Sequence, residues 1–328
     1  MAETLTIATF AAPLSRDGPG LLLRDLGRED AQIEAVAGIV AAIAPDILLL
    51  TDVDHDLDGL AIAALADRLG YDHAFAAPPN TGVPTGLDLD GNGRLGEARD
   101  AQGYGRFRGD GGLAVLARWP VTLVADHTRA LWADQPGAVL PEGEPQAVRA
   151  VQRLSTTAHW EVSVAAPDGP LGLLAWSATP PVFDGPEDRN GRRNRDELMF
   201  WKERLSGQGG PFVLLGNANL DPVDGEGWHA DMAALLAHPA LQDPRPASPG
   251  AALAADAAHL GDPALDTVDW PDGRPGNLRV SYVLPSRDWA VLDAGVFWPA
   301  PDTPEAALLG ADGLAAGPHR LVWVTVQR

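Results

Sequence analysis

The chain has 328 residues, an ordinary hydrophobic content of 45% and a formal net charge of -21. Such a negative surface repels polyanions, which argues against a nucleic-acid substrate. The chain has no cysteine, which excludes disulfides, cysteine–zinc sites, iron–sulfur clusters and thiol catalysis. No apolar run approaches the roughly 18 residues that a membrane span needs. Residues 1–7 lack the basic and apolar regions of a signal peptide, which indicates a cytoplasmic protein, or a periplasmic or secreted one if a leader was trimmed.

The first quarter of the chain alternates predicted strands with predicted helices. In the first of these helices, Ile33, Val36 and Val40 recur at a helical period. Pro45 ends that helix, and a buried strand follows it. This alternation is typical of an α/β protein. In order, we expect strand 5–10, helix 29–44, strand 46–50, helix 57–69 and strand 71–75.

A segment rich in glycine, proline and aspartate, residues 78–111, comes next. We expect it to form a long loop of the functional or mobile kind. No internal repeat and no clear linker divides the chain, so we expect one domain over residues 1–328. Beyond the loop we expect strands 112–117, 150–155, 160–165, 171–176, 212–215, 279–284, 290–296 and 321–326, helices 193–205 and 231–236, and a loop over 243–277.

The most informative segment is the predicted strand from Phe212, which ends at Gly216 in a polar cluster. A strand end is rigid, and the loop that follows can direct side chains into a cleft. The amides of Asn217 and Asn219 would point the same way along an extended chain. This pattern predicts an active-site turn.

A second polar pattern lies inside the long loop. Asp88, Asp90 and Asn92 place oxygen atoms at alternating positions, as in the first half of a calcium-binding loop. The twelfth position of such a loop would hold Glu, and Arg99 stands there. Two alternatives stay open, a structural Ca²⁺ site and a plain turn rich in Asp and Asn.

Basic side chains gather near residue 190. Arg189, Arg192 and Arg193 lie among acidic residues of the same segment. They form either an anion-binding fork beside a cleft or a self-neutralised ion network that fixes a loop. His159 likewise either faces the cleft, where it would contact phosphate, or packs in the interior.

Taken together, six segments resemble the endonuclease/exonuclease/phosphatase superfamily, which has the fold of deoxyribonuclease I. The resemblance is greatest to a bacterial branch of this superfamily with long glycine-rich loops. The resemblance implies an α/β fold, a four-layer α/β/β/α sandwich with two mixed sheets packed face to face, outer helices and an active site at one end. It also implies phosphoester hydrolysis with a divalent metal, usually Mg²⁺. The six segments are Ala8–Phe10, Pro45–Leu50, Gly112–Arg118, Thr179–Asn194, Arg279–Ser286 and His319–Trp323.

By this resemblance, His319 and Asn219 match residues around the phosphate. Asp52 stands where the family has its metal-binding Glu, and Asn217 where it has the acid of an Asp-x-Asn pair. Four further positions depart from the pattern. Ala11 replaces an expected Asn, Ser177 an expected His, and both Ser281 and Pro318 an expected Asp.

These replacements remove carboxylates that a hard cation and a catalytic base require. We therefore expect a binding protein in which the phosphoesterase site is largely lost. The alternative is a divalent-metal-dependent phosphoesterase that acts on a small phosphorylated molecule. In that case Asp52, Asp54 and the loop around Asp88 and Asp90 would hold the metal.

Overall fold

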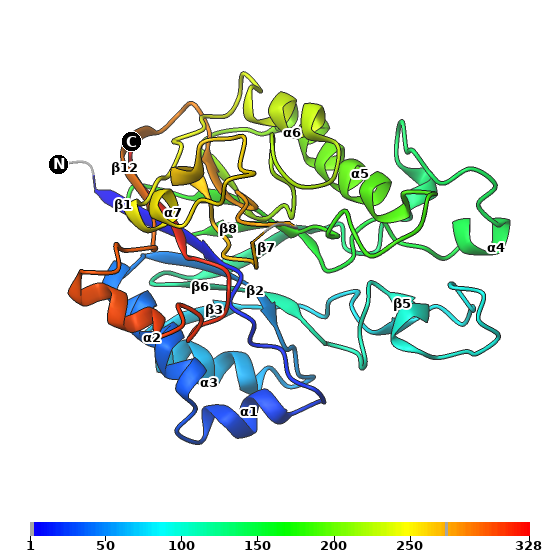
Figure 1. Ribbon diagram of the computed structural model, residues 1–328, viewed down its shortest axis with the longest axis horizontal. Helices are drawn as coiled ribbons and strands as arrows, with labels where there is room; N and C mark the ends of the chain where they lie inside the picture. Colours follow the sequence, from blue (N-terminus) through cyan, green and yellow to red (C-terminus); the bar gives the residue numbers. More distant parts are fainter. Residues whose placement is uncertain (1–2, 273–274) are drawn as a thin grey trace.

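The computed structural model describes residues 3–272 and 275–328, so Met1, Ala2, Gly273 and Arg274 lie outside the described residues. Two predictions therefore fall partly outside this range. They are the single domain over residues 1–328 and the localisation drawn from residues 1–7. Two large sheets face one another (Figure 1). The first sheet has the order β12 (Ala290–Val296), β13 (Val322–Gln327), β1 (Thr4–Phe10), β2 (Ile47–Val53), β6 (Gly112–Ala117) and β3 (His73–Phe75).

Both sheets are mixed, as the resemblance implied. β1 pairs with β2 in parallel, while the other neighbours in the first sheet are antiparallel. In the second sheet β9 and β10 are the parallel pair. The second sheet has the order β11 (Ser281–Pro285), β10 (Phe212–Asn217), β9 (Leu171–Ser177), β8 (His159–Val164) and β7 (Val121–Asp126).

Helices cover the outer faces of both sheets (Figure 1). On the side of the first sheet lie α1 (Leu21–Leu26), α2 (Ala31–Ile43) and α3 (Leu60–Leu69), and on the side of the second lie α5 (Arg189–Arg204) and α6 (His229–Leu236). The Asp30 carboxylate begins α2 by accepting hydrogen bonds from the backbone N–H groups of Gln32 and Ile33. Within residues 3–272 and 275–328, no helix has the length and apolar character to cross a membrane.

Shorter elements lie in the connections between these layers. They are β4 (Val83–Pro84), η1 (Ala98–Asp100), β5 (Ala101–Gln102), η2 (Trp132–Asp134), α4 (Gln146–Arg149), η3 (Leu205–Gly207), α7 (Pro249–Leu253), η4 (Pro263–Leu265) and η5 (Pro304–Leu309).

Alternating side chains of the second sheet divide the interior into two cores. Leu173 and Ala175 of β9 belong to the core shared with the first sheet, whereas Leu174 and Trp176 pack in the core that includes Trp201 of α5. Successive side chains of a strand point to opposite faces, so one strand serves both cores. Because the larger core joins both sheets, we propose that the chain forms one domain.

Most predicted strands and helices are confirmed to within a few residues, but the predicted strand 150–155 is wrong. Those residues follow α4 and are irregular. The carbonyl groups of Arg153, Leu154 and Ser155 accept hydrogen bonds from the guanidinium group of Arg193. Arg153 keeps a single antiparallel bridge, to Leu131, and a side chain from α5 bonds to the carbonyl groups where a longer strand pairing was expected. The expected loop over 243–277 likewise contains α7 and η4.

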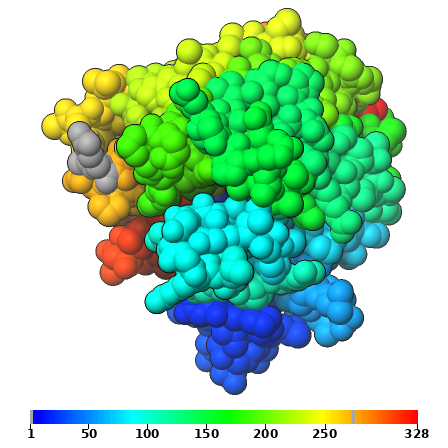
Figure 2. Space-filling model, turned by 90° about the vertical axis from the view of Figure 1, so that its right-hand side faces the viewer, coloured from blue at the N-terminus to red at the C-terminus, as the bar shows by residue number. Residues whose placement is uncertain are grey.

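The long segment 78–111 is anchored to the body of the protein. Its β4 and β5 pair with one another. The amide nitrogen of Asn80 donates hydrogen bonds to the carbonyl groups of Thr128 and Ser155, both at 2.6 Å, and Gln102 donates to the carbonyl of Val151 at 2.6 Å. Figure 2 shows this segment in cyan against the green segments around residues 130–190.

Gly82 lets the segment 78–111 fold tightly. Its φ is 75°, and a Cβ atom there would lie 1.7 Å from the carbonyl oxygen of Phe107. Only glycine accepts this conformation and this close approach. Gly82 therefore allows two parts of the segment to pack closely against one another.

Candidate functional site at the end of the sandwich

Polar residues from three strands of the second sheet meet at one end of the sandwich. Asn217, the last residue of β10, pairs in register with Ser177 at the end of β9 and with Ser281 at the start of β11. In the first sheet, β1 and β2 end at the same side, and Leu14 forms a bridge with Val53. This is the end where the resemblance places an active site.

A short extended segment brings His319 to this end. Val268 forms antiparallel bridges with Leu278 on one side and with His319 on the other. The hydroxyl of Thr267 accepts hydrogen bonds from the backbone N–H groups of Val280 and Ser281, at 2.9 and 3.0 Å. Residues 266–269 thus join the start of β11 to the segment that precedes β13. These residues lie within the predicted loop 243–277, and no local pattern indicates this role.

The imidazole of His319 lacks the partner that the family pattern would supply. Its Nδ1 is buried and has no hydrogen-bond partner among the described residues. The ring packs edge-on against Trp270, with 5.6 Å between the ring centroids. Burial lowers the pKa of His319 to about 4, so the ring is neutral at neutral pH. Pro318 offers no side-chain acceptor that would orient it.

The two amides of the predicted active-site turn bond to the protein itself. Asn217 is 7% exposed, and its side-chain oxygen accepts a hydrogen bond from the backbone N–H of Asn219 at 3.1 Å. Asn219 has a φ of 50°, and its side chain donates to the carbonyl of Ala178 at 2.8 Å. The chain turns at Asn219, so the extended geometry that we assumed for the two amides does not apply. Both side chains stabilise the turn.

Asp52 and Asp54 lie beside this end, where β2 is irregular. Asp52 sits in a bulge of β2 with a φ of 63°, and its carboxylate accepts a hydrogen bond from the Ser15 hydroxyl at 2.8 Å. The Asp54 carboxylate accepts from the N–H groups of Arg16 and Gly111. Burial raises the pKa of each carboxyl group to about 6, and the charge of Asp110 contributes to both increases.

The three arginines predicted to bind phosphate all have partners within the protein. Arg193 is 5% exposed and donates to the backbone carbonyls described above. Arg189 pairs with Glu144 at 2.7 Å, and Arg192 donates to the carbonyl of Glu187 at 3.0 Å. Only Arg189 forms an ion pair, with an acid outside its own segment, while Arg192 and Arg193 bond to backbone carbonyls; the choice between the two alternatives stays a prediction. Arg193 in particular has no exposed face with which to reach a ligand.

His159, also predicted to contact phosphate, lies in the interior. It is 0% exposed, and its ring packs against those of Phe200 and Trp201 with centroid distances of 4.8 and 5.4 Å. Burial lowers its pKa well below the ordinary value. A phosphate cannot reach the ring in this position, so we leave His159 out of the proposed site.

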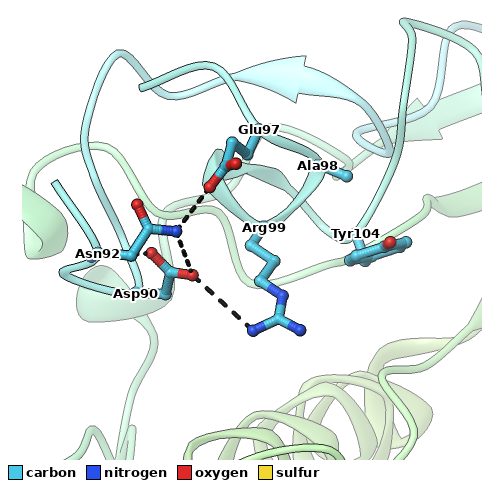
Figure 3. A pocket seen from close by; sticks show the side chains of 6 residues that line it. All are labelled: Asp90, Asn92, Glu97, Ala98, Arg99 and Tyr104. Atoms are coloured by element: carbon cyan, nitrogen blue, oxygen red, sulfur yellow. Dashed lines mark hydrogen bonds and ion pairs between the residues drawn. The ribbon is translucent and has the colours of Figure 1, made fainter. Parts of the chain in front are cut away.

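The predicted calcium loop gains a carboxylate that the sequence analysis missed. Oxygen atoms of Asp88, Asp90 and Asp100 lie within 4.8 Å of one another, and no other such group of three exists in the part of the chain that the structure describes. Figure 3 shows the Asn92 amide pointing to both Asp90 and Glu97, with Arg99 paired to Asp90. Asp100 stands one residue beyond the twelfth position, and a search limited to that position could not find it.

Comparisons with known proteins agree with this architecture. A sequence model of the endonuclease/exonuclease/phosphatase family matches residues 19–313. No curated protein matches the sequence. Among solved structures, an endonuclease/exonuclease/phosphatase from Beutenbergia cavernae DSM 12333 is 18% identical, with a TM-score of 0.58 over 99% of this chain and 71% of that one.

Two other similar structures were solved with DNA. TDP2 of D. rerio, complexed with a single-strand DNA product, is 9% identical, with a TM-score of 0.52 over 99% of this chain and 100% of that one. A variant of the 3′ phosphatase NExo from Neisseria, bound to a product DNA hairpin, is 17% identical, with a TM-score of 0.51 over 98% of each chain. At these identities the likeness shows the fold alone, and it lends no support to our expectation against nucleic acid. Since the family model spans most of the sequence, this chain belongs to the endonuclease/exonuclease/phosphatase family.

Proposed function

We propose that this family member binds a phosphoester at the end of the sandwich but has lost most of its ability to hydrolyse it. One observation carries the proposal. The Nδ1 atom of His319 and the hydroxyl of Ser281 are both buried, and neither has a hydrogen-bond partner within the described residues. In the family pattern, an Asp at the position of Pro318 accompanies the histidine, and another Asp stands at the position of Ser281. A catalytic imidazole without its orienting acid loses about 10⁴ in rate in serine proteases.

The family metal finds few ligands at this end. Mg²⁺ prefers oxygen ligands and often takes one or two carboxylates plus waters. Asp52 and Asp54 would be those two, although Ser15, Arg16 and Gly111 already donate hydrogen bonds to them. When bound there, the ion would polarise a phosphoryl oxygen.

A metal-dependent phosphoesterase is therefore the second candidate. The observation in its favour is that burial, together with Asp110, raises the pKa of both Asp52 and Asp54 to about 6. A group of carboxylates that repel one another is what a bound cation would relieve. For either candidate we propose a small phosphorylated molecule as the ligand, because the net charge of -21 disfavours a polyanion.

Turnover of p-nitrophenyl phosphate and bis-p-nitrophenyl phosphate separates the two candidates. We expect wild-type protein and His319→Ala to release nitrophenol at the same background rate with Mg²⁺, Mn²⁺ or Ca²⁺. Calorimetric titration with p-nitrophenyl phosphate should show binding to the wild type. Robust wild-type turnover that His319→Ala abolishes would replace the binding role with the enzymatic one.

We also propose a structural Ca²⁺ ion in the loop that contains Asp88, Asp90 and Asp100. Their oxygens lie close enough to share one ion, and Ca²⁺ takes six to eight oxygen ligands in flexible geometry. Asn92 adds a side-chain oxygen in the same turn. Arg99 pairs with Asp90 at 3.8 Å, so it would have to swing outward when the ion binds.

Ca²⁺ should raise the melting temperature of the wild type but not of Asp100→Asn. At a concentration of 100 times its dissociation constant, a ligand that binds only the native state adds about 2.7 kcal/mol of stability. Differential scanning fluorimetry with Ca²⁺ and with EDTA measures this gain, and Asp67→Asn, an exposed acid on α3, is the matched control. An equal gain in Asp100→Asn and the control would refute the site.

A further inference from the structure

A second group of ionisable side chains lies close to the end of the sandwich. His259 stands between two carboxylates: its Nε2 is 3.5 Å from Asp224 Oδ2, and its Nδ1 is 3.7 Å from Asp266 Oδ2. The side chain of His259 is 7% exposed, that of Asp224 10% and that of Asp266 1%. Each nitrogen of this mostly buried imidazole thus faces a carboxylate, whereas a histidine at the surface would face water.

Backbone N–H groups hold the Asp224 carboxylate in place, and Asp266 adjoins a bridged segment. Asp224 accepts hydrogen bonds from the N–H groups of Leu260 and Gly261, at 3.0 and 2.8 Å. Asp266 begins the segment 266–269, which bridges to His319 through Val268. His259 therefore lies between two anchored segments, one at Asp224 and one at Asp266. The loop that carries it lies at the surface, where Leu260 is 79% exposed.

One oxygen of this group lacks a donor. Oδ2 of Asp266 is buried and has no hydrogen-bond partner in the described part of the chain. The charges of Asp221, Asp224, Asp256 and Asp262 also act on Asp266. A buried carboxylate without a donor is costly, and further negative charge around it adds to the cost. A proton or a metal cation at this oxygen would remove both penalties.

We propose that His259 Nδ1 and Asp266 Oδ2 bind a divalent metal ion of the zinc class, with Asp224 orienting the imidazole. Zinc bonds to nitrogen at about 2.0–2.1 Å and to carboxylate oxygen at about 2.0–2.2 Å, so an ion fits between two atoms 3.7 Å apart. A metal-bound imidazole commonly donates its other N–H to a carboxylate, and Asp224, whose Oδ2 lies 3.5 Å from Nε2, is the carboxylate placed to accept it when the ion binds.

The ligand set also selects the class of metal. An imidazole ligand favours Zn²⁺ over the Mg²⁺ and Ca²⁺ that all-oxygen sites prefer. This separates the group from the loop around Asp88 and Asp90. With two protein ligands, water would fill the remaining coordination positions, so we expect a lower affinity than in open zinc sites, which have three protein ligands. This metal site is independent of the proposed function, because His259, Asp266 and Asp224 are not among the residues matched to the active-site pattern of the family.

Equilibrium dialysis against Zn²⁺, followed by metal analysis of the protein, tests the site. We expect His259→Gln and Asp266→Asn each to bind one Zn²⁺ fewer than the wild type. Asp224→Asn should keep the site but weaken its affinity by about 10–100-fold, as for other residues that orient a metal ligand. Asp100→Asn, in the separate acidic loop, should match the wild type in this Zn²⁺ affinity. Equal zinc content in the wild type, His259→Gln and Asp266→Asn would overturn the proposal.

A measurement on the wild type alone guards against variants that fail to fold. Crystals of the unmodified protein soaked in Zn²⁺ should show an anomalous-scattering peak at the zinc edge between His259 and Asp266. A soaked crystal with no peak there would overturn the proposal whatever the variants do. Turnover assays play no part in either test, so failure here leaves the proposed phosphoester binding untouched.

Discussion

The triple variant Asn217→Asp, Ser281→Asp and Pro318→Asp should hydrolyse bis-p-nitrophenyl phosphate in Mg²⁺ at least about 10²-fold faster than the wild type. The orienting acid of a catalytic histidine alone is worth about 10⁴ in rate, although grouped residues are not additive. An Asp at position 318 would give the His319 imidazole a nearby carboxylate, and Asp residues at 217 and 281 would give the cation anionic ligands.

The same triple variant with His319→Ala is the matched control, and it should return to the background rate. Ser281 is 1% exposed, so an Asp there is costly to bury, and circular dichroism must first show that the variant folds. A folded triple variant that stays silent would place the loss elsewhere, at Ala11 or at the shortened Asp52. That outcome would contradict our assignment of the defect to the three repaired positions.

Arg193→Ala should lower the free energy of unfolding by about 3–5 kcal/mol, because it takes a buried charged donor away from backbone carbonyl groups, at about 1–3 kcal/mol for each group left without a partner. The guanidinium donates to the carbonyl of Leu154 at 2.8 Å and to those of Arg153 and Ser155 at 2.5 and 3.3 Å. It also favours the charged form of Glu197, which is 0% exposed and whose pKa burial raises to about 7. Its removal takes a donor from three carbonyls and a compensating charge from one buried acid.

Urea denaturation followed by tryptophan fluorescence measures this loss. Arg192→Ala is the matched control, because that residue is half-buried on the same helix and donates to the carbonyl of Glu187; we expect it to lose less than about 1 kcal/mol. If Arg193 instead served as a phosphate ligand, Arg193→Ala would weaken p-nitrophenyl phosphate binding while leaving stability close to that of the control.

The fold was largely predictable because its signals are local. The helical period of Ile33, Val36 and Val40 marks one side of α2, and all three are buried. The run of apolar residues in β9 marks a strand covered on both faces, with Leu173 in one core and Leu174 in the other. Buried strands and amphipathic helices are recognisable without knowing their partners.

The site was less predictable because its geometry depends on distant contacts. Nothing near Val268 in the sequence indicates that it lies between Leu278 and His319. The failed strand at 150–155 has the same origin, since its carbonyl groups bond to a side chain of α5. Arg193 looked like an anion ligand because a sequence shows its charge but not its burial.

The hydrogen bonds of Asn80 and Gln102 fix one border of the proposed site. Both side chains hold the segment 78–111 to backbone carbonyls of residues 128–155, and this segment ends next to Asp52, with Gly111 close to its carboxylate. We therefore expect this border of the proposed site to keep its position before any ligand arrives. Ligand association should then proceed in one kinetic phase without a closing step, which stopped-flow measurement of binding would test.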